Sequence, residues 1–172
     1  SRLLIRKKIK VGGELDAAYV FYTCDNSADL YVNGRKLAHV DPWMKPQLVD
    51  ISAALKQGEN IIAADAVNTD GVAGFIAWVQ LSYRNGTMQN VLTDTSWSWK
   101  KRPPEDVPVA LADDRGWLAP VSLGGHGVGP WKKLSLPGGR QTPDSATLAG
   151  ILRKSPGERS NAEKQQINDE FK

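Results

Sequence analysis

The sequence has few of the residues on which most site chemistry depends. It contains one cysteine, Cys24, and two histidines, His39 and His126. A single cysteine excludes a disulfide within the chain, and no C-x-x-C-H motif is present, so no haem is attached covalently to this chain. Neither histidine has a partner at the short spacing of a zinc site. No apolar run approaches the ~20 residues of a membrane-crossing helix, so we expect no membrane span.

Charge of one sign is not concentrated in one region of the sequence either. The 172 residues include 22 Lys and Arg against 19 Asp and Glu, which gives a net charge of +3. Basic clusters at residues 6–10, 100–102 and 132–133 are separated by acidic residues. Proteins that bind nucleic acid usually gather positive charge on one face and interleave aromatic residues with it. The dispersed pattern therefore predicts no nucleic-acid partner.

A signal peptide is not visible at the start of the sequence. The first residue is Ser1 rather than Met, and the last twelve residues, 161–172, are mostly polar. We therefore expect the chain to be a piece of a larger protein, and the missing signal says little about where that protein is located.

Period-2 alternation and turn pairs dominate the first 135 residues. Residues 73–83 are apolar on both faces, which is typical of a central strand. The pairs Asn33-Gly34 and Asn85-Gly86 are strong hairpin signals, because both residue types tolerate positive φ. Strands are predicted at 3–11, 15–24, 28–37 (a hairpin), 60–68, 73–83 and 90–101.

Helical structure is expected only in short pieces. Asp50 and Ser52 can cap a single turn over residues 53–57, which Gly58 ends. Residues 102–117 contain three prolines and are predicted to form a loop, and a last strand is expected close to residue 135. These features together favour an all-β fold, an antiparallel β-sandwich.

The composition changes near Pro137. Residues 137–145 are typical of a linker, and helices are expected over 145–154 and 160–171. Ser160 and Glu163 have the spacing of a capping box. We therefore divide the chain into a β-sandwich domain, residues 1–136, and a linker with a short helical C-terminal tail, residues 137–172, that leads to a neighbouring domain.

Four segments in order resemble a known family. They are ADLYVNGRKL (28–37), VDISAALKQGENIIAADAVN (49–68), TDTSWSWKK (93–101) and ADDRGWLAPVSLGGHGVGPW (112–131). Together they resemble the galactose-binding-like jelly roll, as in the sugar-binding domain of family 2 glycoside hydrolases and the N-terminal domains of bacterial α-rhamnosidases. With its helical exit, the sequence is also similar to lectin-like domains of large planctomycete secreted proteins that sit beside cytochrome-like modules.

The resemblance covers residues 2–135 and implies both a scaffold and a function. For the scaffold, it implies that Leu55 fills the core and that Trp97 and Trp117 pack inward. The catalytic residues of those hydrolases lie in a separate barrel that is absent here, so the resemblance implies no enzyme. It implies a non-catalytic carbohydrate-binding module of a larger secreted protein, periplasmic or extracellular, with a polysaccharide or glycan as partner. The alternative is a structural module that packs on neighbouring domains of its parent and has no glycan ligand.

Catalytic groups are also scarce in the sequence itself. Cys24 ends an aromatic strand and is predicted to behave as a small buried apolar residue. Acidic residues adjoin at 105–106 and 113–114, whereas glycoside hydrolysis needs two carboxyls about 5 to 9 Å apart across a cleft. No catalytic residue is therefore predicted.

The family resemblance further implies a possible structural calcium ion, and no other cofactor. Asp25, Asn26 and Asp29, or Asp113 and Asp114, could supply oxygen ligands. In the alternative interpretation, these side chains only bond the backbone of their own turns.

A sugar site needs an aromatic platform and a few polar groups. Trp78, Trp97 and Trp117 are predicted to be core residues, although Trp99 shares a strand face with Trp97 and could be its core neighbour. The predicted platforms, in order of preference, are Trp43, Trp131 and Trp99, and the polar partners of a sugar are predicted to be His39, Asp41, Lys45 and His126.

Overall fold

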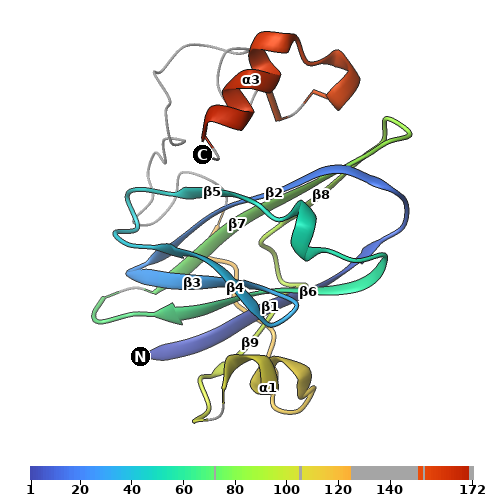
Figure 1. Cartoon of the computed structure of the whole chain (residues 1–172). Coiled ribbons are helices and arrows are strands. Elements are labelled where there is room, and N and C mark those ends of the chain that lie inside the picture. Colours follow the sequence, from blue (N-terminus) through green and yellow to red (C-terminus); the bar gives the residue numbers. More distant parts are fainter. Residues whose placement is uncertain (72, 105, 125–150, 153, 171–172) are drawn as a thin grey trace.

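A computed structural model describes residues 1–71, 73–104, 106–124, 151–152 and 154–170 (Figure 1). In these residues two antiparallel sheets pack face to face, which confirms the predicted all-β sandwich. The five-stranded sheet has the order β4-β3-β6-β1-β9, and the four-stranded sheet has the order β5-β2-β7-β8. The strands are β1 (Arg2–Val11), β2 (Leu15–Asp25), β3 (Ser27–Val32), β4 (Arg35–Val40), β5 (Gln47–Asp50), β6 (Gly58–Val67), β7 (Gly74–Tyr83), β8 (Met88–Leu92) and β9 (Ser98–Lys101).

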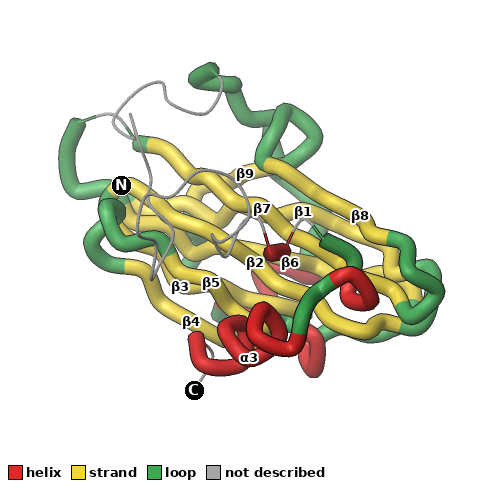
Figure 2. Tube along the Cα trace, turned by 90° about the horizontal axis from the view of Figure 1, so that it is seen from above, coloured by secondary structure: helices red, strands yellow, loops and turns green. Residues whose placement is uncertain are grey.

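The main core lies between the two sheets, whose strands run across the molecule in Figure 2. Alternate residues of each strand face it, as the period of two requires. On β2, for example, Val20, Tyr22 and Cys24 are buried there. The predicted central strand at 73–83 is confirmed, since β7 lies between β2 and β8.

The outer faces of both sheets are partly covered by helical segments. Helix α1 (Val107–Ala112) packs Val107 and Leu111 against Leu4 on the five-stranded sheet. On the other side, residues 151–152 and helix α3 (Asn161–Glu170) pack against Tyr19 of the four-stranded sheet. Figure 1 shows α1 and α3 on opposite sides of the sandwich.

The Asn33-Gly34 turn joins β3 to β4 and is hydrogen-bonded to the segment that leads into β6. Both residues have positive φ, 51° and 82°, as the sequence predicts. The Asn33 amide donates to the carbonyl of Ala54 and to Oδ1 of Asn60, and its own Oδ1 accepts from the Ile61 N–H. The tip of the hairpin is therefore scaffold, bonded to the segment that enters β6.

Three local predictions need correction. Residues 102–117 contain helix α1 rather than loop throughout, because Pro108 lies in the first turn, where its missing N–H has no helical partner. Residues 90–101 form two strands, since a turn begins at Asp94, whose carbonyl accepts from the Trp97 N–H, and moves the chain to the other sheet. The predicted helical turn is the 3₁₀ turn Ser52–Ala54, so it is shorter than expected and ends before Gly58.

The C-terminal capping box is confirmed. The Ser160 N–H donates to Oε2 of Glu163 at 2.7 Å, and the Glu163 N–H donates to the Ser160 hydroxyl at 3.2 Å. A short 3₁₀ turn, Pro156–Glu158, precedes it. The boundary at 136/137 lies outside the described residues and stays a prediction. Over the described part of the chain, no helix has the length and apolarity to cross a membrane.

Candidate functional site

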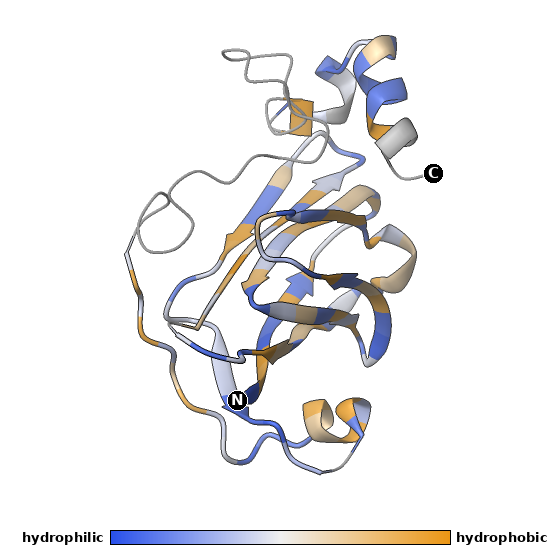
Figure 3. Ribbon diagram, turned by 90° about the vertical axis from the view of Figure 1, so that its left-hand side faces the viewer, coloured by the Kyte–Doolittle hydropathy of each residue, from blue (hydrophilic) through white to orange (hydrophobic). Residues whose placement is uncertain are grey.

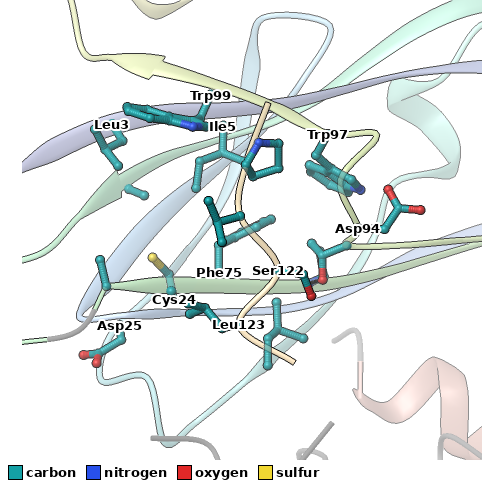
Figure 4. Close-up of a pocket in the computed structure, with 18 of the residues that line it drawn as sticks. Leu3, Ile5, Cys24, Asp25, Phe75, Asp94, Trp97, Trp99, Ser122 and Leu123 are labelled. Atoms are coloured by element: carbon teal, nitrogen blue, oxygen red, sulfur yellow. Dashed lines mark hydrogen bonds between the residues drawn. The ribbon is translucent and has the colours of Figure 1, made fainter. Parts of the chain in front are cut away.

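A cavity of about 1130 Å³ opens at the end of the sandwich where β1 begins and β2 and β6 end (Figure 4). The five-stranded sheet contributes Leu3, Ile5 and Trp99 to its lining, and the four-stranded sheet contributes Cys24 and Phe75. Residues 120–124 cross it as an extended segment. The cavity thus combines residues far apart in the sequence.

Aromatic side chains form much of the inner wall. Trp97 is buried, as predicted, and its ring lies 5.6 Å from that of Phe75, measured between centroids. The Trp97 indole N–H donates to the carbonyl of Leu92 at 2.9 Å, which fixes the ring. Trp99 is only half-buried, because β9 is the edge strand of its sheet. Of the two tryptophans, Trp99 therefore offers more open surface.

The segment that crosses the cavity is attached to Trp99. The backbone of Trp99 exchanges hydrogen bonds with Leu118 at 2.8 and 2.9 Å, and its indole N–H donates to the Ala119 carbonyl at 3.2 Å. These bonds place Ser122 and Leu123 over the cavity (Figure 4). The position of this segment therefore depends directly on Trp99.

Two carboxylates lie among the lining residues, Asp25 at the end of β2 and Asp94 after β8. Oδ1 of Asp94 accepts from the Ser96 hydroxyl and from the Ser96 N–H, and these bonds hold the pKa of the Asp94 carboxyl below its usual range. Asn68 is also a lining residue, but its Oδ1 is buried from solvent and has no hydrogen-bond partner in the described structure. The two carboxylates are groups that can accept hydrogen bonds from hydroxyls.

Cys24 completes the wall as an apolar residue. Burial, with a smaller contribution from the charge of Asp25, raises the pKa of the thiol to about 12. The group is therefore a neutral thiol at physiological pH, which confirms the prediction of a small buried residue.

Comparison with known proteins places this geometry in context. No protein-family model matches the chain. A curated relative, the α-L-rhamnosidase of Streptomyces avermitilis, is 26% identical over 138 residues, which is 76% of this chain and 13% of the relative. A crystal structure of the S. avermitilis enzyme complexed with L-rhamnose superposes with a TM-score of 0.72 at 25% identity, over 79% of this chain and 14% of that one.

A second similar protein of known structure is a lectin. The Pleurotus ostreatus lectin without ligand superposes with a TM-score of 0.66 at 28% identity, over 76% of this chain and 38% of the lectin. Its complex with GalNAc has a TM-score of 0.67 at 24% identity. The chain resembles a galactose-binding-like sugar-binding domain. It spans about an eighth of the length of the rhamnosidase that it matches, so the resemblance concerns one domain of that enzyme.

Among the predicted sugar-binding residues that the structure describes, Trp99 lines the cavity. Trp43 is half-buried between β4 and β5, and its carbonyl accepts from the Thr23 hydroxyl at 2.5 Å. Asp41 and Lys45 are exposed in the same loop. His39 lies on β4. None of these four lines the cavity, whereas His126 and Trp131 lie outside the described residues.

Two of the first three residues predicted to bind calcium, Asn26 and Asp29, have other partners. Partial burial works to raise the pKa of the Asp29 carboxyl, but Lys36 at 2.8 Å and His39 at 2.7 Å outweigh it, so the pKa is lowered. Oδ1 of Asn26 accepts from Thr69, and Asp25 lies at the edge of the cavity lining, with its carboxylate directed outward in Figure 4.

The second predicted calcium pair is also bonded elsewhere. Asp113 pairs with Arg115, and Asp114 pairs with Arg6 and Lys8. Within the described residues, no group of three His, Cys, Asp or Glu side chains could hold a metal ion. Calcium stays a prediction that these contacts do not support.

Two tryptophans predicted to be core residues lie on outer faces instead. Trp117 is half-buried near α1, with the guanidinium of Arg6 at 3.9 Å and the ammonium of Lys100 at 4.7 Å from its ring centre. Trp78 packs beside the C-terminal segment, and its indole N–H donates to Asn90 at 2.9 Å. Cations occupy the neighbourhood of the Trp117 ring, which makes it a poor platform for a sugar.

Sequence reasoning did not identify Phe75, Asp94 or the segment 120–124 as parts of a site. Phe75 belongs to an apolar strand in which nothing distinguishes it from core residues. Asp94 bonds the backbone of its own turn, a common role for Asp in loops, so its type and position gave no sign that it also lines the cavity. Segment 120–124 reaches the cavity because the backbones of residues 99 and 118 are hydrogen-bonded, and the sequence gives no signal for that pairing.

Proposed function

We propose that the chain is a non-catalytic carbohydrate-binding module of a larger secreted protein, and that the cavity holds the sugar. The observation that carries this proposal is the half-buried Trp99, which faces the cavity together with Phe75. The C–H face of a sugar packs on an aromatic ring, while its hydroxyls bond a few polar groups. Asp25 and Asp94 are the candidate groups among the lining residues.

The comparisons support glycan binding from two directions. The rhamnosidase structure is complexed with L-rhamnose, and one lectin structure is complexed with GalNAc. Because the chain covers only 13% of the rhamnosidase, we transfer no hydrolytic activity to it. The shared feature is the β-sandwich, and the ligands of these proteins support a carbohydrate as the partner of this chain.

The ionisation of the cavity also favours binding over catalysis. A glycosidase needs a carboxyl with a raised pKa as its general acid. In contrast, the pKa of Asp94 is lowered, and Cys24 is a neutral thiol at physiological pH. The described lining includes no histidine that could activate Cys24.

Affinity electrophoresis in polysaccharide gels, combined with a glycan array, tests the proposal. We expect the wild-type chain to be retarded on at least one glycan, and Trp99→Ala to lose about tenfold or more in affinity, which corresponds to roughly 1.4 kcal/mol. Trp43→Ala is the matched control, because that ring does not line the cavity. It should bind as the wild type does.

A second variant keeps the test valid if Trp99→Ala fails to fold. Val121 lines the cavity and is 85% exposed, so Val121→Trp can block the cavity without altering the core. We expect it to fold normally and to lose glycan binding. Full retention by both Trp99→Ala and Val121→Trp contradicts the proposed site.

The alternative, an interdomain module without a glycan ligand, is favoured by one observation. Leu92, Val121 and Leu123 line the cavity and are more than half exposed. Figure 3 shows apolar residues along the segment that rises past the sheets after α1. Such a surface also fits a neighbouring domain. A folded chain that no glycan retains would favour this function.

A further inference from the structure

The lining of the cavity includes residues on both faces of strand β7. On the core side, Ala77 belongs to the main core cluster and Phe75 packs against it; Phe75, Trp97 and Trp99 are seen together in Figure 4. Trp78 also lines the cavity, and it lies on the opposite face of β7, because successive side chains of a strand alternate between the two faces. One sugar ring cannot contact both faces of a strand, so the lining offers two separate positions.

The outer position has an aromatic, apolar surface. Trp78 is half-buried, and its cross-strand neighbours are Phe21 of β2 and Leu92 of β8, which both line the cavity as well. Residues directly opposite each other on adjacent strands project from the same face of a sheet, so these three side chains lie together. The C-terminal segment packs against part of Trp78 and leaves another part in the lining. A ring held in this way is a platform for the C–H face of a sugar.

A polar group of fixed orientation lies beside this ring. The Trp78 indole N–H donates to Oδ1 of Asn90 at 2.9 Å, and Nε2 of Gln80 donates to the same oxygen at 3.4 Å. An indole nitrogen can only donate, so the Asn90 atom opposite it is the oxygen. Gln80 is oriented in the same way, since its Oε1 accepts from the guanidinium of Arg159 at 3.5 Å.

These bonds leave the other half of the Asn90 amide for a ligand. Asn90 is exposed and lines the cavity, and its Nδ2 is directed away from the oxygen that Trp78 and Gln80 share. Within the described residues, this Nδ2 has no hydrogen-bond partner. It can therefore donate to an oxygen atom of a sugar that packs on Trp78.

We propose that Trp78 and Asn90 form a second sugar position in the cavity, and that the ligand is therefore an oligosaccharide rather than a single sugar. Trp78 and Asn90 hold one residue of the glycan, while Trp99 holds another. The cavity volume of about 1130 Å³ exceeds the ~300–1,000 Å³ of pockets that enclose drug-sized ligands, so it has room for more than one ring. The inference rests on the proposed function, because both positions belong to the same cavity.

Isothermal titration calorimetry with sugars of increasing length tests the second position. The probes are the monosaccharide, disaccharide and trisaccharide prepared from each polysaccharide that retards the wild-type chain in affinity electrophoresis. We expect the affinity of the wild type to rise about tenfold from the monosaccharide to the trisaccharide, because the longer sugar fills both positions. Trp99→Ala should lower the affinity for all three lengths.

Asn90→Ala tests the polar group of the second position. Asn90 is an exposed residue of the edge strand β8, so its replacement leaves the core intact. The variant should bind the monosaccharide as the wild type does and lose about fivefold to tenfold in affinity for the trisaccharide, as expected for one hydrogen bond.

Two further variants make the test specific. Trp78→Phe keeps an aromatic contact with the C-terminal segment but removes the N–H that orients Asn90, so its loss should also be confined to the longer sugars. Asn161→Ala is the matched control, since it removes an exposed amide of α3 that is not among the described lining residues. It should match the wild type at every length.

Three results separate the two proposals. Equal affinity of the wild type for the monosaccharide and the trisaccharide overturns the second position while leaving glycan binding intact. If Asn90→Ala loses nothing, or loses the same factor at every length, Asn90 does not belong to a second position. If no polysaccharide retards the folded chain, the proposed function fails, and the inference fails with it.

Discussion

Arg159 offers a direct test of whether the C-terminal segment folds as part of the sandwich. This side chain is nearly buried, with the residue 6% exposed. Its Nε–H donates to the carbonyls of Ile151 and Lys154, both at 3.1 Å. Its Nη2 donates to the carbonyl of Leu152 at 3.3 Å and to Oε1 of Gln80, on β7, at 3.5 Å. One guanidinium thus bonds both the tail and the sheet.

Replacing Arg159 by Met keeps most of the aliphatic volume and removes the donors. The carbonyls of Ile151 and Leu152 then lose a partner inside a buried cluster, and each unsatisfied buried acceptor costs about 1 to 3 kcal/mol. Removing a charge that was buried at a desolvation cost offsets part of this loss. We expect a net destabilisation of about 2 kcal/mol, or a fall in Tm of about 4 to 8 °C for a chain of this size.

Urea denaturation of the full chain, followed by tryptophan fluorescence, measures this change. Trp78 lies beside the cluster that contains residues 151, 152 and 167, so its emission reports on the tail. Arg115→Met is the matched control, because the Arg115 side chain is 90% exposed and, among the described residues, pairs with Asp113 two positions before it. If Arg159→Met is as stable as Arg115→Met, the tail is not coupled to the sandwich and the reasoning is wrong.

Three further predictions concern the scaffold. Gly34→Ala should lower stability by about 1 to 2 kcal/mol in thermal unfolding, because φ is +82° and the new Cβ would lie 3.2 Å from Pro108, whereas Gly12→Ala meets no atom within 4 Å and should change little. Cys24 should react with a thiol reagent at pH 8 only after unfolding, and fast labelling of the native chain would contradict this. The pKa of the Cys24 thiol is about 12 in the folded chain against 9.0 when free. The stability due to the neutral thiol is therefore complete below pH 9 and is lost as the pH rises from 9 towards 12. Asp65→Asn should cost about 2 kcal/mol in urea denaturation, because its fully buried carboxylate pairs with two arginines at 2.7 and 3.2 Å; an unchanged midpoint would show that this ion pair contributes nothing.

Local patterns were sufficient to predict most of the strands. Asn33-Gly34 and the alternation in 3–11 and 15–24 depend only on residues near in sequence, and the strands of the structure, 2–11 and 15–25, follow them closely. Helix α1 was missed because three prolines suggested a loop, although Pro108 occupies a first-turn position that tolerates proline. The break between β8 and β9 was missed because the change of sheet depends on tertiary packing, which alternation does not encode.

The site was harder to predict than the fold for a physical reason. Whether a tryptophan is open or covered depends on what other segments pack against it. Trp43, the preferred platform, does not reach the cavity, whereas Trp99 does, because β9 is an edge strand and residues 118–119 bond to it. The cavity is formed by residues from positions 1 to 124, and a single sequence gives no signal for such distant pairings.

The central claim is that a sugar binds in the cavity beside Trp99. The most direct measurement is fluorine NMR of the chain with 5-fluorotryptophan at its six tryptophans, assigned by single Trp→Phe variants and titrated with the glycan that the array retains most strongly. We predict that the Trp99 resonance shifts with saturation, while the resonances of Trp43 and Trp117 stay in place. A shift of Trp43 with Trp99 unchanged would contradict the proposed site and would favour the loop between β4 and β5.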